Sequence, residues 1–139
     1  MTKSDKLRNI VAQGWTMMLI VFLANLLVDL IKIAVEGDTT KWGDHLGMKG
    51  VQFLLVIMAI YVFMPMLVRT ISATWFRYVV VGLTVLMTLF VAAHEVSHLS
   101  AQTKPFGMFH ALDLTHHALG VWVIVSAVLW ARQPEELGA

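Results

Sequence analysis

The sequence predicts an all-α integral membrane protein whose four transmembrane helices form an up-down-up-down bundle. Of its 139 residues, 58% are hydrophobic and only 14% are charged, whereas a soluble domain is normally about 45–50% apolar and about 25% charged. The apolar residues also fall into four long runs, and a membrane-spanning helix needs about 20 such residues. Because the connections between these runs are short, consecutive helices are expected to be antiparallel neighbours.

The four runs define the predicted spans, which are 14–35, 48–68, 75–98 and 109–130. Little sequence remains outside them, so residues 1–139 are expected to form a single transmembrane domain. The first run does not resemble a cleavable signal peptide, because it is too long and no small-residue cleavage site follows it. Gly82 in the third span is expected to permit close helix packing. Four tryptophans near span ends are expected to be interfacial anchors: Trp15, Trp42, Trp75 and Trp130.

Lysine and arginine are distributed unequally between the two sides of the predicted membrane. The side that carries both termini and the connection between the second and third spans holds Lys3, Lys6, Arg8, Arg69, Arg77 and Arg132. The other side holds Lys41, Lys49 and Lys104. Basic residues favour the cytoplasmic side, so both termini are expected in the cytoplasm. We expect a multi-pass protein of a bacterial inner (plasma) membrane.

Composition excludes several kinds of site and partner. The chain contains no cysteine, which rules out disulfides, zinc sites with thiolate ligands and cysteine-ligated iron–sulfur clusters. Its formal net charge is +1, and it has no basic run beyond the N-terminus. Nucleic-acid binding is therefore not expected, and the lipid bilayer is the expected surrounding.

Five of the six histidines fall where the third span ends and the fourth begins. The third span closes on His94, Glu95 and His98, and the fourth opens on His110, Asp113, His116 and His117. Imidazoles and carboxylates are the groups that bind zinc and other transition metals. Ionisable residues inside a membrane are costly and usually functional. These seven residues are therefore the predicted ligand set of a metal or haem centre near the outer face.

Helical spacing brings the predicted ligands onto matching faces. At about 100° per residue, the three from the third span fall within roughly one 100° sector. In the fourth span, His110, Asp113 and His117 share a face, and His116 lies at its margin. Antiparallel neighbours then pair residues at similar depth: His98 with His110, Glu95 with Asp113, and His94 with His116 or His117.

A directly bound transition metal is the first interpretation of this pattern, with copper, iron and zinc all compatible. Copper accepts both imidazole and thioether ligands, and Met108 lies two residues before His110. Asp29 in the first span and His45 in the outer connection are second-tier candidate ligands. The protein would then be an accessory or cofactor-bearing subunit of a membrane redox or metal-handling complex, or a homo-oligomer.

Haem b is the second interpretation, because it needs one imidazole from each of two facing helices. His94 with His117, or His98 with His110, would supply such a pair. Small residues would then lie near the ring plane: Gly120, Ala118, Ala92 and Ala93. Four-helix bundles commonly hold such cofactors in their core.

Residues 94–98 read His-Glu-Val-Ser-His and resemble the H-E-x-x-H motif of zinc metalloproteases. The resemblance implies a membrane metallopeptidase in which His94 and His98 bind zinc and Glu95 is the general base. The same segment, together with Asp-Leu-Thr-His-His at 113–117, resembles the histidine boxes of membrane di-iron hydroxylases, but the third box of that family is missing. Two further alternatives remain, a purely structural accessory subunit and a quinone-binding subunit. Whether the protein is an enzyme stays open.

Overall fold

The computed structural model describes residues 1–36, 48–101 and 108–134. This part of the chain forms four α-helices, which are α1 (Lys3–Glu36), α3 (Met48–Thr70), α4 (Thr74–Ala101) and α5 (Met108–Ala131). Each contains a stretch long and apolar enough to cross a membrane: Lys3–Val28, Gly50–Thr70, Thr74–Ala93 and Leu114–Ala131. The prediction of an all-α chain with four helices of membrane-spanning length is confirmed.

Helix α1 begins at Lys3, well before the predicted start at residue 14, because its first turn is capped. The Asp5 backbone N–H donates to the Thr2 hydroxyl at 3.1 Å, and the Thr2 backbone N–H donates to the Asp5 carboxylate at 3.2 Å. Asp5 also accepts a hydrogen bond from Arg8 at 2.6 Å. A reciprocal cap of this kind satisfies amide groups that a helix start otherwise leaves free. The other three helices match their predicted bounds to within about three residues.

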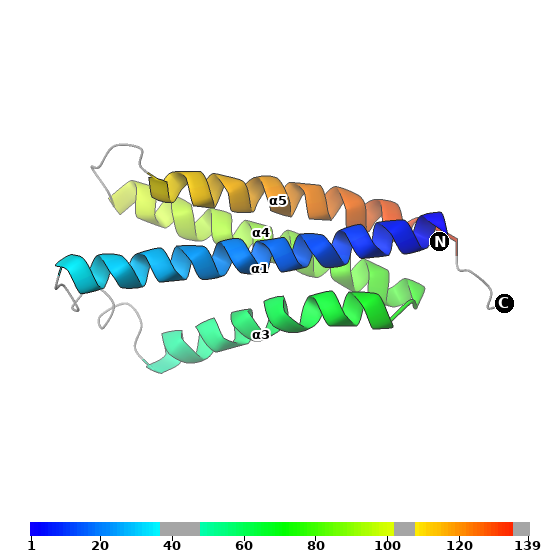
Figure 1. Ribbon diagram of the computed structural model, residues 1–139, viewed down its shortest axis with the longest axis horizontal. Helices are drawn as coiled ribbons and strands as arrows, with labels where there is room; N and C mark the ends of the chain where they lie inside the picture. Colours follow the sequence, from blue (N-terminus) through cyan, green and yellow to red (C-terminus); the bar gives the residue numbers. More distant parts are fainter. Residues whose placement is uncertain (37–47, 102–107, 135–139) are drawn as a thin grey trace.

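Consecutive helices run in opposite directions, so α1 begins and α5 ends at the same end of the bundle (Figure 1). Backbones approach closely where α1 meets α5, where α4 meets α5, and where α1 meets α3. Helices α3 and α4 also touch through large side chains, for example Phe53 and Phe90, whose ring centroids are 5.3 Å apart. The resulting order around the bundle is α3, α1, α5, α4.

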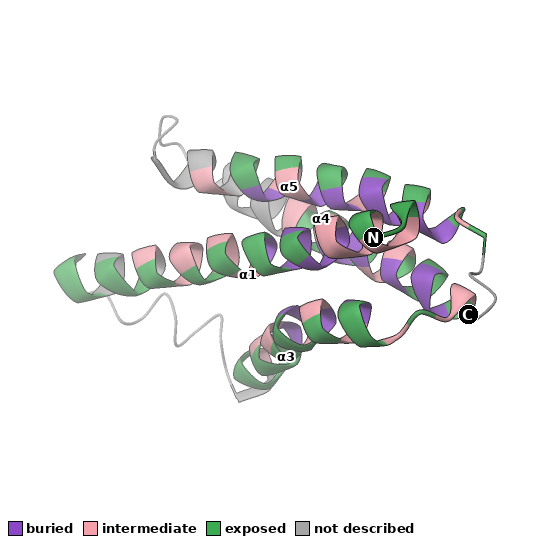
Figure 2. Cartoon of the chain, turned by 45° about the vertical axis from the view of Figure 1, so that its right-hand side comes forward, coloured by how far each residue is buried: buried purple, intermediate pink, exposed green. Residues whose placement is uncertain are grey.

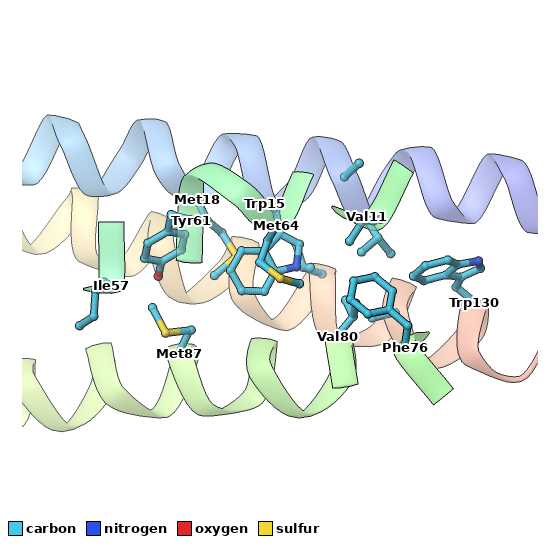
Figure 3. Packing of buried hydrophobic residues seen from close by; sticks show 14 residues of the cluster. Val11, Trp15, Met18, Ile57, Tyr61, Met64, Phe76, Val80, Met87 and Trp130 are labelled. Atoms are coloured by element: carbon cyan, nitrogen blue, oxygen red, sulfur yellow. The ribbon is translucent and has the colours of Figure 1, made fainter. Parts of the chain in front are cut away.

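The described core occupies the half of the bundle that holds the chain termini (Figure 2). Its members come from the first halves of α1 and α4 and from the later parts of α3 and α5: Val11, Ala12, Trp15, Met18, Ile57, Tyr61, Met64, Val68, Phe76, Val80, Met87, Val123, Ala127 and Trp130. The large side chains of this cluster fill the space between the helices (Figure 3). The helix ends that carry the predicted ligands extend beyond this packed half.

Two of the four tryptophans expected at the membrane interface belong instead to the core. Trp15 and Trp130 are fully buried between helices, so the prediction that they anchor the protein to lipid headgroups is wrong. Trp75 is 65% exposed, as an anchor requires, and Trp42 lies outside the described residues. Position near a span end does not reveal which face of the helix a side chain occupies. The face determines whether each of these tryptophans is buried or exposed.

Close helix packing depends on Gly14 and Gly120 rather than on Gly82, for which the expectation is wrong. A Cβ added at Gly82 would meet nothing within 4 Å. A Cβ at Gly14 would collide with Val123, which brings α1 against α5. A Cβ at Gly120 would lie 2.5 Å from the Thr88 hydroxyl, which brings α5 against α4.

Arg77 is buried, although its charge suggested a residue facing the cytoplasm. Its Nε donates to the Ser72 carbonyl at 3.1 Å, and its Nη1 donates to the Gln133 carbonyl at 2.9 Å and to the Trp130 carbonyl at 3.4 Å. The guanidinium also lies 5.5 Å from the Trp130 ring centroid. Because the last carbonyls of a helix have no partner within it, Arg77 ties the start of α4 to the end of α5.

Candidate metal centre

Among the described side chains of α5, one histidine is buried on the inward face. The buried positions of this helix include His116, Gly120, Val123, Ala127 and Trp130, a spacing of three and four residues that marks one stripe of a helix. His116 is only 1% exposed and stands at the end of the stripe nearest the predicted ligands. The sequence placed it at the margin of the ligand face, whereas the structure places it on the face that points into the bundle.

His116 is held by Tyr61, a residue of α3, which is not a neighbour of α5 along the chain. The Tyr61 hydroxyl of α3 and the His116 Nε2 are 3.0 Å apart and both are buried. The two rings meet edge to face, with centroids 5.9 Å apart and planes at 90°. The hydroxyl donates when Nε2 carries no proton, and it accepts when Nε2 does. Either way, one ring nitrogen of His116 is committed to Tyr61.

Tyr61 is itself fixed by aromatic side chains of α1. Phe22 stacks on it with centroids 5.3 Å apart and planes at 26°. Trp15 packs against it at 5.6 Å with planes at 57°, and the indole Nε1 of Trp15 is buried without a hydrogen-bond partner among the described residues. Three helices thus meet at the pair formed by Tyr61 and His116, and its geometry is built into the core.

The buried stripe of α4 leads toward the predicted ligands of that helix. Val80, Thr84 and Met87 are buried on its inward face. Continuing from Met87 in steps of seven and four residues reaches positions 94 and 98, within about 20° of the same line. Positions 94 and 98 thus continue the helical line of the buried α4 stripe.

The contact between Thr88 and Gly120 sets the register of α4 against α5. The two helices are antiparallel (Figure 1). A residue of α4 a given number of positions after Thr88 therefore lies at the same level along the bundle as the residue of α5 the same number of positions before Gly120. Glu95 and Asp113 are each seven residues beyond it, and therefore lie at the same level along the bundle. This count agrees with the predicted pairing of Glu95 with Asp113, whereas position 94 is level with position 114 and not with His116 or His117.

The same count brings His98 level with His110, each ten residues beyond the contact. The side chains of both lie outside the described residues, as do those of His94, Glu95 and Asp113. The second-tier candidates Asp29 and His45 lie outside them as well. Of the predicted ligands, the structure describes the side chains of His116, which is buried, and His117, which is partly buried. The described side chains by themselves contain no group of three or more metal-type ligands.

The small residues expected beside a haem plane do not share one surface. Ala118 and Ala93 are exposed, whereas Gly120 is buried and its space is filled by Thr88. Ala92 is partly buried. The tight contact at Gly120 lies about two turns from His94. At the level of Gly120, α4 and α5 are in direct contact, and helices held this close disfavour a porphyrin between them about two turns away.

Sequence reasoning missed Tyr61 and Arg77, and each carried a signal. Tyr61 is the one tyrosine within the second apolar run, and a buried tyrosine hydroxyl usually finds a hydrogen-bond partner. Arg77 lies a few residues inside α4 rather than in the connection before it, where a charged side chain needs a partner close by. Neither signal identifies the partner on α5, which in both cases is more than 50 residues away in the chain.

No protein-family model, curated protein or solved structure matches this chain. Function is therefore inferred from the residues and their placement.

Proposed function

We propose that this protein is a small inner-membrane protein that holds a directly bound transition metal at the end of the bundle away from the chain termini. Its ligands would come from the seven histidines and carboxylates of α4 and α5: His94, Glu95, His98, His110, Asp113, His116 and His117. The proposal places both termini in the cytoplasm and the metal near the outer face. So small a chain would act as a subunit of a larger redox or metal-handling complex, or as a homo-oligomer.

One observation carries the proposal. The inward stripes of α4 and α5 are locked in register by Thr88 and Gly120. The α4 stripe continues to positions 94 and 98, and the α5 stripe ends at the buried His116, one turn from position 113. Histidines on a lipid-facing surface would not indicate a metal site. Histidine and carboxylate positions near the interior of a helix bundle are typical of one. Imidazole and carboxylate ligands suit zinc, copper and iron.

A direct metal site is favoured over haem b by the closeness of α4 and α5. A porphyrin ligated by His94 and His117, or by His98 and His110, would have to separate these helices by the thickness of the ring and two imidazoles. The contact between Gly120 and Thr88 holds them together about two turns from His94. A metal ion needs no such separation, because its ligands lie about 2 Å from it.

The test is elemental analysis and an optical spectrum of the detergent-purified protein, recorded oxidised and dithionite-reduced after removal of any affinity tag. We expect near-stoichiometric copper, iron or zinc and no Soret band. The double variant His94→Ala/His117→Ala should lose the metal and keep its helix content by circular dichroism. Tyr78→Phe, at an exposed position of α4, should keep both. A Soret band that shifts on reduction would replace the metal ion with haem. Metal-free wild-type protein would refute the centre.

The zinc peptidase remains the second candidate because His94 and His98 both continue the inward stripe of α4. Glu95 lies at the edge of that stripe, on the side that Thr88 shows to face α5. If the metal is zinc and peptide hydrolysis is detected, Glu95→Gln should abolish turnover and leave zinc bound. Turnover that survives this substitution would exclude Glu95 as general base.

A further inference from the structure

The contact between Tyr61 and His116 specifies how His116 would take part in the centre, an inference that rests on the proposed metal site. His116 is buried at the end of the packed core, level with position 92 of α4 by the register of Thr88 and Gly120. It is one turn from Asp113 in α5. His116 thus stands where the described core meets the predicted ligands.

We propose that His116 binds the metal through Nδ1 and that Tyr61 is the positioning residue that holds its Nε2. The Nε2 is already engaged by the Tyr61 hydroxyl at 3.0 Å. The two nitrogens of an imidazole diverge from the ring, so Nδ1 points away from Tyr61 and keeps its lone pair when Nε2 carries the proton. The hydroxyl oxygen of Tyr61 then accepts from Nε2–H.

This arrangement is the one that metal-bound histidines usually adopt. A ligating imidazole generally donates its second N–H to a fixed acceptor, which sets the tautomer and the ring orientation. Tyr61 meets that requirement because Phe22 and Trp15 hold its ring in place and because it is fully buried. A tyrosine held this firmly presents its hydroxyl to His116 at a set position.

The first experiment measures the affinity of the purified protein for Zn²⁺ by competition with a chromophoric chelator. Tyr61→Phe removes only the hydroxyl and leaves the ring contacts, and it should weaken Zn²⁺ binding about 10–100-fold, as loss of such an outer partner typically does. Tyr78→Phe is the matched control, because Tyr78 is 59% exposed, and its affinity should equal that of the wild type. Thermal unfolding of the metal-free forms checks that each variant is folded.

The second experiment needs no variant of Tyr61. Protein labelled with ¹⁵N-histidine is observed by NMR with and without Zn²⁺, and His116→Gln identifies the His116 signals. We expect Zn²⁺ to shift the Nδ1 resonance of His116 while Nε2 stays protonated. A purely structural hydrogen bond would leave both resonances in place, and that result would overturn the inference, as would a metal-induced shift of Nε2 instead.

The two proposals fail in different ways. Wild-type protein that binds no Zn²⁺, and that is metal-free as purified, refutes the centre itself. Wild-type protein that binds Zn²⁺ with an affinity unchanged by Tyr61→Phe, or with His116 signals unmoved, leaves the centre standing and refutes the role of Tyr61 and His116 within it.

Discussion

Replacing Gly120 by alanine tests the contact that sets the register of α4 and α5. The added Cβ would lie 2.5 Å from the Thr88 Oγ1, 2.9 Å from its Cγ2 and 3.2 Å from its Cβ. Thr88 is held in place by its hydroxyl, which donates to the Thr84 carbonyl at 2.8 Å, and a β-branched side chain has few χ1 rotamers available in a helix. The helices must therefore move apart, or Thr88 must give up its hydrogen bond.

The expected loss of stability follows from two opposing effects. Overpacking of this kind costs about 1–3 kcal/mol, whereas replacing glycine by alanine inside a helix contributes about 1 kcal/mol in favour of folding. Gly82→Ala is the matched control, because its Cβ would enter open space and only the favourable effect remains. Gly120→Ala should thus be less stable than Gly82→Ala by about 1–3 kcal/mol, the steric cost alone.

The assay is equilibrium unfolding in detergent, followed by circular dichroism during titration with a denaturing detergent. Thr88→Ala in the background of Gly120→Ala removes the two closest contacts and should recover most of the lost stability. Equal stability of Gly120→Ala and Gly82→Ala would refute the close approach of α4 and α5. A double variant no more stable than Gly120→Ala would show that Thr88 is not what the new methyl group meets.

Two further predictions concern the end of the bundle that holds the termini. Arg77→Met should lower the free energy of unfolding by about 1.5–3 kcal/mol, because hydrogen bonds from a charged donor to the carbonyls at the end of α5 are lost. Arg77→Lys should lose less stability than Arg77→Met but should not reach that of the wild type, since an ammonium cannot reproduce the planar fork of a guanidinium. A stability unchanged in both would mean that those carbonyls do not depend on Arg77. The chain has no cysteine, so Ser4→Cys and Asp44→Cys each create a single thiol for labelling. A membrane-impermeant maleimide added to intact cells should label the second and spare the first, and the opposite pattern would reverse the proposed orientation.

The fold was predictable because apolar run length alone defines membrane-spanning helices. The exception was α1, whose start at Lys3 depends on the cap formed by Thr2 and Asp5 and not on hydropathy. Which face of each helix turns inward was not predictable in the same way. Trp15 and Trp130 lie near helix ends in the sequence and in the core in the structure, because neighbouring helices, rather than depth in the membrane, determine their burial.

For the candidate site, the sequence predicts residue types and most of the levels along the bundle, and not the contacts that surround His116. Counting residues back from a short connection is enough to bring Glu95 level with Asp113, and the contact between Thr88 and Gly120 gives the same level independently. Tyr61 could not be assigned to His116 in this way. The two residues are on helices separated by α4 in the chain, and their meeting depends on how α3 packs across the bundle.

The register of the candidate centre is set from a distance by the packed half of the bundle. Arg77, Thr88 and Glu95 lie on nearly the same side of α4, since Glu95 follows Arg77 by eighteen residues, about five full turns. The first of them bonds the end of α5 and the second touches Gly120. Two contacts on one side of a helix fix both its rotation and its sliding position against a neighbour. The third position on that side is 95, which counts level with position 113 of α5. The packed half of the bundle therefore determines the register at which the proposed ligands would meet.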